Sequence, residues 1–214
     1  MPDVATQPFE WIAGDLSLNF ANTITWDVDG PRSDQLGRYR DFVRWAREAG
    51  LLTPESSARL LETAERETER ARGALERALT ARRLIREVFH ARASEQLVPV
   101  ETLDALSTRI AEGLSLSRIV PRGERFAREW TRDPTDLDQV IRPVLSAAAD
   151  LLLSERVALV RECANQHCGW LFLDESRNHM RRWCDMRVCG SRAKARRHYA
   201  RVVERESCGV DRGA

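Results

Sequence analysis

The chain has 214 residues, of which 43% are hydrophobic and 31% charged, and its formal net charge is +1. This length suits one medium-sized domain with a small additional module, and the composition is that of a soluble globular protein. No apolar run approaches the roughly 20 residues that a membrane-spanning helix needs, and the N-terminal residues lack the basic start and apolar core of a signal peptide. We therefore expect a cytoplasmic protein that has no contact with a membrane and keeps its thiols reduced.

The N-terminal part of the chain begins with weak local patterns. Residues 1–13 are expected to be extended. Residues 15–22 alternate apolar and polar side chains, so this segment can form a short strand or the first turns of a helix. Asp29 and Gly30 then form a pair that is typical of a turn.

The patterns that follow predict helices. Ser33 can cap a helix that ends just before Gly50. At Thr53-Pro54 a capping residue precedes proline at the first helical position, where proline is favoured. The helical pattern that starts there continues to about residue 93 and predicts two helices, separated within residues 65–73.

The middle of the chain changes from helix to hairpin and back. Residues 99–112 predict a helix, and residues 114–130 predict a small β-hairpin because apolar side chains flank a Pro-Arg-Gly turn. Asp133-Pro134 repeats the cap-and-proline pattern and predicts a helix to Leu153. Residues 155–162 are expected to form a strand or a linker.

Four of the five cysteines form two pairs of equal spacing. Cys163 and Cys168 make the first pair, and Cys184 and Cys189 make the second, after a spacer of fifteen residues. Zn²⁺ prefers four ligands at tetrahedral corners, and two short cysteine loops supply them at a low cost in chain entropy. The pattern predicts one structural Zn²⁺ ion bound by all four thiolates. Buried free thiols, a redox pair, or His167 as a ligand in place of Cys168 are the alternatives.

The residues around these cysteines predict a treble-clef-like module. Residues 169–174 are aromatic and favour a strand, and residues 180–183 can return as a second strand. Such a hairpin would bring Cys184 beside Cys168. Gly190-Ser191 can then cap a helix from about residue 192 to residue 206.

The charges of the chain are unevenly distributed. Residues 163–205 carry ten Lys or Arg against four Asp or Glu, whereas the preceding 162 residues carry 23 against 27. A basic end on an acidic body is typical of a nucleic-acid contact. A solvated helix face, or one that pairs with an acidic surface, is the alternative. The candidate DNA contacts are Arg181, Arg182, Arg192, Lys194, Arg196, Arg197 and Arg201.

The C-terminal motifs resemble a known family. The segments Cys168-Gly-Trp-Leu-Phe-Leu-Asp174, Arg181-Arg-Trp-Cys184 and Cys189-Gly-Ser-Arg192 are similar to the CGNR zinc finger, which closes many bacterial proteins. That family is named for Cys-Gly-Asn-Arg, and this chain has Ser191 in the place of the asparagine. Serine can also cap a helix, so the fold that the resemblance implies is unaffected.

The N-terminal half resembles the ABATE domain, which precedes this finger in proteins described as stress-induced transcription regulators. The similarity lies in Leu16-Ser-Leu-Asn-Phe-Ala-Asn-Thr23, Phe42-Val-Arg-Trp-Ala46 and Gly50-Leu-Leu52. It favours a helix over a strand for residues 15–22. It also implies a DNA-binding regulator whose larger domain senses a small molecule or forms a homodimer.

Four residues are candidates for contacting such a small-molecule effector. They are polar or aromatic and lie close together in the N-terminal segment: Asn19, Asn22, Thr23 and Trp26. The alternative is that Asn and Thr cap turns and that Trp fills the core.

Together these patterns predict a mainly α-helical protein with two parts. Residues 1–155 would form a helical domain with a small β-hairpin, residues 156–208 the zinc module with its basic helix, and residues 209–214 a flexible tail. An enzyme is not expected, because the chain has no phosphate-binding loop, nucleophile elbow or zinc-protease motif, and four cysteine ligands leave no open position for water. A zinc-stabilised protein-interaction module is the alternative function, and an uncharacterised enzyme a more remote one.

Overall fold

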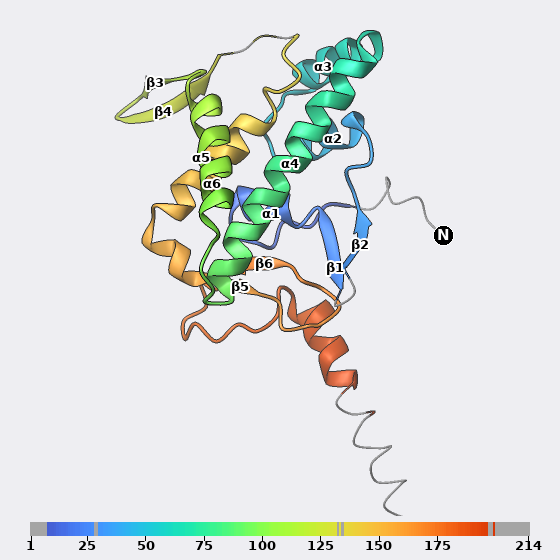
Figure 1. Ribbon diagram of the computed structural model, residues 1–214, viewed down its shortest axis with the longest axis vertical. Coiled ribbons are helices and arrows are strands. Elements are labelled where there is room, and N and C mark those ends of the chain that lie inside the picture. Colours follow the sequence, from blue (N-terminus) through green and yellow to red (C-terminus); the bar gives the residue numbers. More distant parts are fainter. Residues whose placement is uncertain (1–7, 28–29, 132, 134, 197–198, 200–214) are drawn as a thin grey trace, which may run out of the picture.

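The computed structural model describes residues 8–27, 30–131, 133, 135–196 and 199, and it is mainly α-helical, as predicted (Figure 1). A further helical stretch covers residues 191–196, and a 3₁₀ helix precedes the first cysteine pair. The helices are α1 (Leu16–Ala21), α2 (Tyr39–Glu48), α3 (Pro54–Arg66), α4 (Thr68–Ala93), α5 (Val100–Leu114) and α6 (Ile141–Leu152). The strands pair in order as β1 (Ile24–Asp27) with β2 (Gly30–Asp34), β3 (Ser117–Arg122) with β4 (Arg125–Trp130), and β5 (Val160–Glu162) with β6 (Leu171–Leu173), all antiparallel.

Helix α4 is the element around which the others pack. Figure 1 shows it crossing the molecule, and it contacts the other five α-helices named above as well as β5 and β6. Its first half buries mainly alanines, whose small side chains let neighbouring helices approach closely, and its second half buries larger side chains that fill the core. The buried alanines include Ala71, Ala74, Ala78 and Ala81, and the larger side chains Leu84, Ile85, Val88 and Phe89.

An aromatic cluster joins α1 to α2. The ring centroid of Phe20 lies 5.6 Å from that of Phe42 and 5.0 Å from that of Trp45. Trp11, from the extended N-terminal segment, lies 5.8 Å from Trp45. These large rings bury much apolar surface and fix the short helix α1 in place.

Several expected elements are present. The segment 15–22 contains helix α1, with the Asp15 carboxylate accepting a hydrogen bond from the Ser17 amide at its start and Asn22 at its end. Thr53 caps α3, and the break between α3 and α4 falls at Glu67. The hairpin predicted for residues 114–130 is β3–β4, and its turn contains Gly123 at a φ of +61°.

Two helices start later than predicted. Ser33 lies in β2, opposite Thr25, so the expected cap is wrong and α2 starts only at Tyr39. Asp133 accepts a hydrogen bond from the Thr135 amide at 2.8 Å, which closes a turn rather than starting a helix. A second such turn follows at Asp136, and α6 starts at residue 141. Asp and Ser side chains bond backbone amides equally well in turns and at helix starts, so the local pattern alone does not distinguish the two.

The strand pairing inside the C-terminal module also differs from the prediction. Strand β6 pairs with β5, and residues 180–183 form no strand. Strand β5 ends directly before Cys163, so the hairpin closes around the first cysteine pair instead of the fifteen-residue spacer. The end of the spacer contacts the first cysteine loop through single hydrogen bonds, such as the one that the Ala164 amide donates to the Arg182 carbonyl at 2.9 Å.

Strand β6 belongs to two cores at once. Leu171 and Leu173 are buried in the large core of the helical part, whereas Phe172 is buried among the four cysteines. Successive side chains of a strand point to opposite faces, so three residues are enough to join both cores. Strand β6 therefore joins the two parts of the chain that were expected to divide near residue 155.

Among the ranges described above, no helix is both long and apolar enough to cross a membrane.

Candidate metal centre

The four paired cysteines come together at one point. All four are buried, and their Sγ atoms lie within 4.8 Å of one another. The Sγ of Cys184 lies 3.5 Å from that of Cys168 and 3.6 Å from that of Cys189, too far for a disulfide bond. Four sulfurs bound tetrahedrally at 2.3 Å from Zn²⁺ would lie about 3.8 Å apart. The thiol cluster is therefore compact enough to hold a zinc ion.

The thiols of the cluster shift one another's pKa values. Hydrogen bonds from Cys168 and then Cys184 hold the pKa of the Cys163 thiol far below its usual range. Their hydrogen bonds to Cys163 raise the pKa of Cys168 and, most strongly, that of Cys184. These hydrogen bonds favour a thiolate on Cys163 and oppose ionisation of Cys168 and Cys184. A metal cation bound by thiols favours their thiolate forms.

The first cysteine pair lies in the turn between β5 and β6. The Cys163 amide donates to the Trp170 carbonyl at 2.8 Å, and the Cys168 amide donates to the Asn165 carbonyl at 2.9 Å. Gly169 has a φ of +63°, a conformation that favours glycine, and it redirects the chain into β6. From α4, the Arg86 guanidinium donates to the Gly169 carbonyl at 2.6 Å and braces this turn against the helical part.

The second cysteine pair lies in a helical turn. Asp185 caps it by accepting hydrogen bonds from the amides of Arg187 and Val188, so the helix starts inside the pair and the cap predicted at Gly190-Ser191 is wrong. A β-carbon on Gly190 would lie 2.9 Å from the Met186 Sδ atom. The glycine after Cys189 thus permits a close approach within this turn.

Asn165 is a supporting residue that the sequence reasoning missed. It is buried, and its Nδ2 atom donates to the Cys189 Sγ atom at 3.3 Å. Its Oδ1 atom accepts from the Arg196 guanidinium at 2.6 Å and from the His167 amide at 3.3 Å. Hydrogen bonds to ligand atoms orient them and stabilise their charged form. His167 itself is not part of the metal-ligating group found among the described residues.

Two protein families match the chain over these two parts. The ABATE family, described as "Putative stress-induced transcription regulator", matches residues 14–155, and the CGNR zinc finger matches residues 160–202. The chain belongs to the ABATE family. The four clustered cysteines lie within the matched CGNR finger, and the match together with the cluster supports metal binding there. No protein of curated function matches the chain.

One predicted DNA contact of the CGNR finger faces inward. The Arg181 guanidinium donates to the carbonyls of Trp183, at 3.0 Å, and of Cys184. It also lies 4.4 Å from the ring centroid of Phe172. These contacts tie the second cysteine pair to β6 and occupy Arg181 within the finger.

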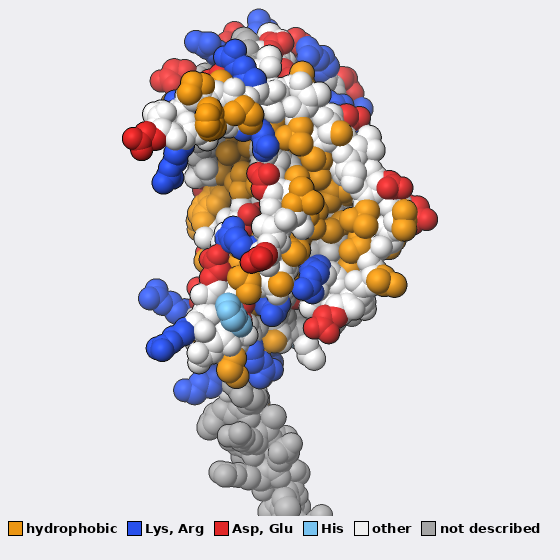
Figure 2. All heavy atoms as spheres, turned by 90° about the vertical axis from the view of Figure 1, so that its left-hand side faces the viewer, with side chains coloured by type: hydrophobic (Ala, Val, Ile, Leu, Met, Phe, Trp, Pro, Cys, Tyr) orange, Lys and Arg blue, Asp and Glu red, His pale blue; other side chains and the backbone are white. Residues whose placement is uncertain are grey.

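The other predicted contacts divide into two groups. Arg182, Arg192 and Lys194 are exposed, and Arg196 is exposed but donates to Asn165. Figure 2 shows Lys and Arg side chains gathered around the finger, at the end of the molecule where the described chain stops. Arg197 and Arg201, with Cys208 and the predicted flexible tail at 209–214, lie outside the described residues, and beyond residue 196 only Tyr199 of the predicted basic helix is described.

Three of the four predicted effector contacts of the ABATE domain are engaged by protein groups. The Asn22 side chain donates to the Leu171 carbonyl at 2.8 Å and accepts from the Leu171 amide at 2.9 Å. Asn19 accepts from the Ala13 amide at 3.1 Å. Thr23 donates to the Phe20 carbonyl and accepts from Arg82. The Trp26 side chain lies outside the described part of the structure.

Proposed function

We propose that this protein regulates transcription in the cytoplasm by binding DNA through the exposed cations of its CGNR finger. A single Zn²⁺ ion held by the four thiolates would act structurally, fixing the two cysteine turns relative to each other. With all four positions taken by sulfur, no site is left for a metal-bound water, so we propose no enzymatic activity.

The observation that carries this proposal is the position of the exposed cations. Arg182 follows β6 in the spacer, whereas Arg192 and Lys194 lie on the helical stretch that leaves the second cysteine pair. A metal bound by the four cysteines would therefore hold these three charges on one rigid module. Contacts from such side chains to DNA phosphates release condensed counterions and give an affinity that falls steeply with salt.

The test is a binding titration of zinc-loaded protein on duplex DNA at several salt concentrations. Replacing Arg182, Arg192 and Lys194 with alanine together should reduce the slope of log K against log salt by about 2 to 3, since each phosphate contact contributes about 0.9. The matched control replaces Arg66, Arg83 and Arg118, which are exposed on the ABATE domain. Zinc content, measured in parallel, should be normal in both variants. Equal affinities and slopes for the two variants would contradict DNA binding through the finger.

A second function is favoured by apolar residues on the same module. Met180, Met186 and Val188 are exposed on the finger, and exposed apolar side chains of this kind occur at protein contacts. A protein-interaction module would bind its partner with little salt dependence and would lose affinity when Met186 is replaced by a charged residue. The salt titration therefore separates the two functions.

We further propose that the ABATE domain controls DNA binding by sensing a small molecule, or by bringing two copies together as a homodimer. Sensing is supported by the direct contacts between the helical part and the finger. Through β6 and Asn22, the helical part holds the finger directly, so a change in helix packing would reach it.

A further inference from the structure

We propose that two copies of this protein associate through α5 and the β3–β4 hairpin, with the hairpin of each copy packed on the start of α5 in the other. This inference rests on the homodimer proposed above and names the surface that forms it. Its test measures association in the absence of DNA, so a failure of this inference is distinguishable from a failure of the proposed regulator.

The β3–β4 hairpin has an apolar face that is largely exposed to solvent. Both strands are fully described, and neither contains a buried residue. Pro121 lies opposite Phe126 in the register, and Ile119 lies two residues before Pro121, so these three side chains share one face. Phe126 is 78% exposed and Ile119 is 64% exposed. An isolated two-stranded hairpin is only marginally stable in water, so packing of this face against a partner would stabilise it.

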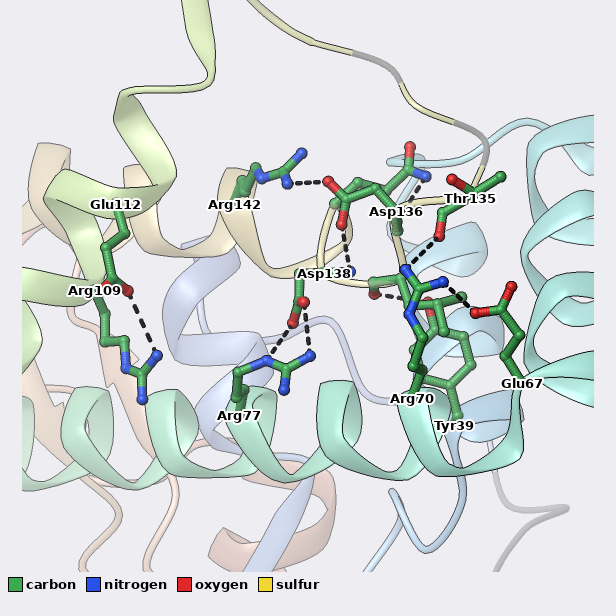
Figure 3. A network of polar contacts seen from close by, with 12 residues as sticks. Tyr39, Glu67, Arg70, Arg77, Arg109, Glu112, Thr135, Asp136, Asp138 and Arg142 are labelled. Carbon is green, nitrogen blue, oxygen red and sulfur yellow. Dashed lines mark hydrogen bonds and ion pairs between the residues drawn. The ribbon is translucent and has the colours of Figure 1, made fainter.

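The hairpin is fixed to the helices at its base. In the segment that follows β4, Asp136 pairs with Arg142 of α6. Asp138 accepts two hydrogen bonds from Arg77 of α4, at 2.9 and 2.7 Å (Figure 3). Figure 1 shows the hairpin projecting sideways from the end of α5. A surface that is already ordered loses little conformational freedom on binding, which lowers the cost of association.

The tip of the hairpin carries an excess of positive charge. Arg122 lies directly opposite Arg125, and like charges in this position destabilise a strand pair. Among the described residues neither of these arginines forms an ion pair, whereas Arg118, nearer the base, pairs with Glu129. Glu124 in the turn offsets only one of the two charges. A partner surface that carries carboxylates would therefore complement the tip.

The start of α5 and the residues just before it offer such a surface. Leu97, Val100 and Leu103 are exposed, Leu97 almost completely. Glu101 and Asp104 lie beside them, are exposed, and form no ion pair with the residues that the structure describes. Figure 2 views the molecule from the side on which Figure 1 places α5 and the hairpin, and it shows hydrophobic side chains gathered there. The apolar and acidic groups of α5 thus match the apolar and basic groups of the hairpin.

A second copy of the chain can bring these two surfaces together. Within one chain they lie at opposite ends of α5, whose 15 residues span about 22 Å. The hairpin projects away from α5 instead of folding back along it, so it does not reach the start of its own helix (Figure 1). A two-fold axis across the middle of α5 would place each hairpin on the start of α5 in the other copy, and every contact would form twice. Ser107 and Ala111, which are small and exposed on α5, would let the two helices approach closely at this axis.

The first test is sedimentation velocity of the full-length, zinc-loaded protein without DNA, over a range of micromolar concentrations. The parent protein should sediment as a dimer. Phe126→Ala should weaken the dimer by about 100-fold or more, because the ring is removed from two equivalent contacts. Met186→Ala, at an exposed apolar residue of the finger, is the control and should leave association unchanged. A parent protein that stays monomeric throughout, or equal association of the two variants, would overturn the proposal.

Reversal of charge tests which surfaces meet. One variant combines Arg122→Glu with Arg125→Glu, so that its hairpin and its α5 start are both acidic. The other combines Glu101→Lys with Asp104→Lys, so that both of its surfaces are basic. Each variant alone should be monomeric because like charges repel, whereas an equimolar mixture should form a dimer that contains one chain of each kind.

The unfolding temperatures of both variants check that they fold. If each variant alone dimerises as the parent does, or if the mixture stays monomeric, the hairpin does not pack on α5 and the proposal fails. Dimerisation of a protein that does not bind DNA would leave this inference standing and reject the proposed regulator. DNA binding by a protein that remains monomeric would reject this inference and leave the regulator standing.

Discussion

Asn22 acts as a substitute for a neighbouring strand. Its side-chain amide bonds both the N–H and the C=O of Leu171, on the side of β6 that β5 leaves open, and all of these atoms are buried. The Leu173 amide donates to the Ala13 carbonyl on the neighbouring segment. The finger is thus bonded to the helical part through backbone groups of β6, and Asn22 supplies two of the contacts.

Replacing Asn22 with alanine should lower the free energy of unfolding by about 2–5 kcal/mol, because a buried donor and a buried acceptor of Leu171 would each lose their partner. Urea unfolding measures the change. Asn178→Ala, at an exposed asparagine of the spacer, is the control and should be close to neutral. Unchanged stability of the Asn22 variant would instead favour its predicted role in contacting an effector.

Two glycines should respond in opposite directions to the same substitution. Gly113 lies inside α5, and a β-carbon there would make ordinary contacts of 3.6 to 3.9 Å. Gly113→Ala should therefore stabilise the protein by about 0.5–1 kcal/mol, the difference in helix propensity. Gly50 follows α2 at a φ of +74°, so Gly50→Ala should destabilise although no atom lies nearby. Thermal unfolding compares the two, and a shift of the same sign in both would contradict this account.

At the scale of elements, one ion pair fastens the β1–β2 hairpin to α4. The buried Arg82 donates to both oxygens of the Asp34 carboxylate and to the Thr23 hydroxyl. Burial raises the pKa of Asp34, but the hydrogen bond and the charge of Arg82 outweigh it, so the pKa of this carboxyl is below its usual value. The charged pair therefore stabilises the fold above the ordinary pKa of an aspartate, and this stability is lost as pH falls through the lowered one.

Asp34→Asn should reduce the free energy of unfolding at neutral pH by about 1–2 kcal/mol, a value kept small because 36% of the Asp34 side chain is exposed. The difference from the parent protein should begin to shrink below about pH 4, where the carboxyl of the unfolded chain takes up its proton, and should disappear only below the lowered pKa of the folded carboxyl. Denaturant unfolding over a pH series measures this. Asp104→Asn, at an exposed residue of α5, is the control. A difference that stays constant down to low pH would contradict the role of the charge.

The sequence predicts an element well where nearby residues determine its backbone conformation, and poorly where a distant strand determines it. Thr53 with Pro54 marks a helix start correctly, and Gly123 a hairpin turn, because both depend on backbone geometry nearby. Ser33 misleads, since the strand opposite it, β1, takes that segment into a hairpin. Strand β6 was assigned the wrong neighbour for the same reason, because the choice between two possible partners depends on the tertiary structure.

The metal site shows the same division. Spacing alone identifies the four cysteines, because metal ligands must be close together and short loops ensure that. The inward position of Arg181 was not predictable, since it depends on carbonyl groups that only the folded finger brings together. The role of Asn165 is likewise not identified from the sequence. The one pattern that could have indicated it is the presence of an asparagine inside a tight cysteine loop.

For the molecule as a whole, the shared strand predicts one cooperative unfolding transition. Removing the metal with a chelator, or replacing Cys184 with serine, should lower the temperature at which the helices of the ABATE domain unfold, because β6 contributes Leu171 and Leu173 to their core. Far-ultraviolet circular dichroism follows those helices. Cys208→Ser, at the cysteine beyond the matched finger, is the control. Unchanged melting of the helices in metal-free protein would show two independent parts instead.

The two family matches end and begin at residues 155 and 160, but the folded chain does not divide into separate cores there, because Leu171 and Leu173 of the finger pack in the core of the helical part. A finger cut out there would expose two leucines to water and lose the amide that Asn22 provides. Grafting this finger onto a different protein would therefore require two features of the host. It would need an apolar surface on which Leu171 and Leu173 can pack, and a side chain that hydrogen-bonds the backbone of β6 as Asn22 does.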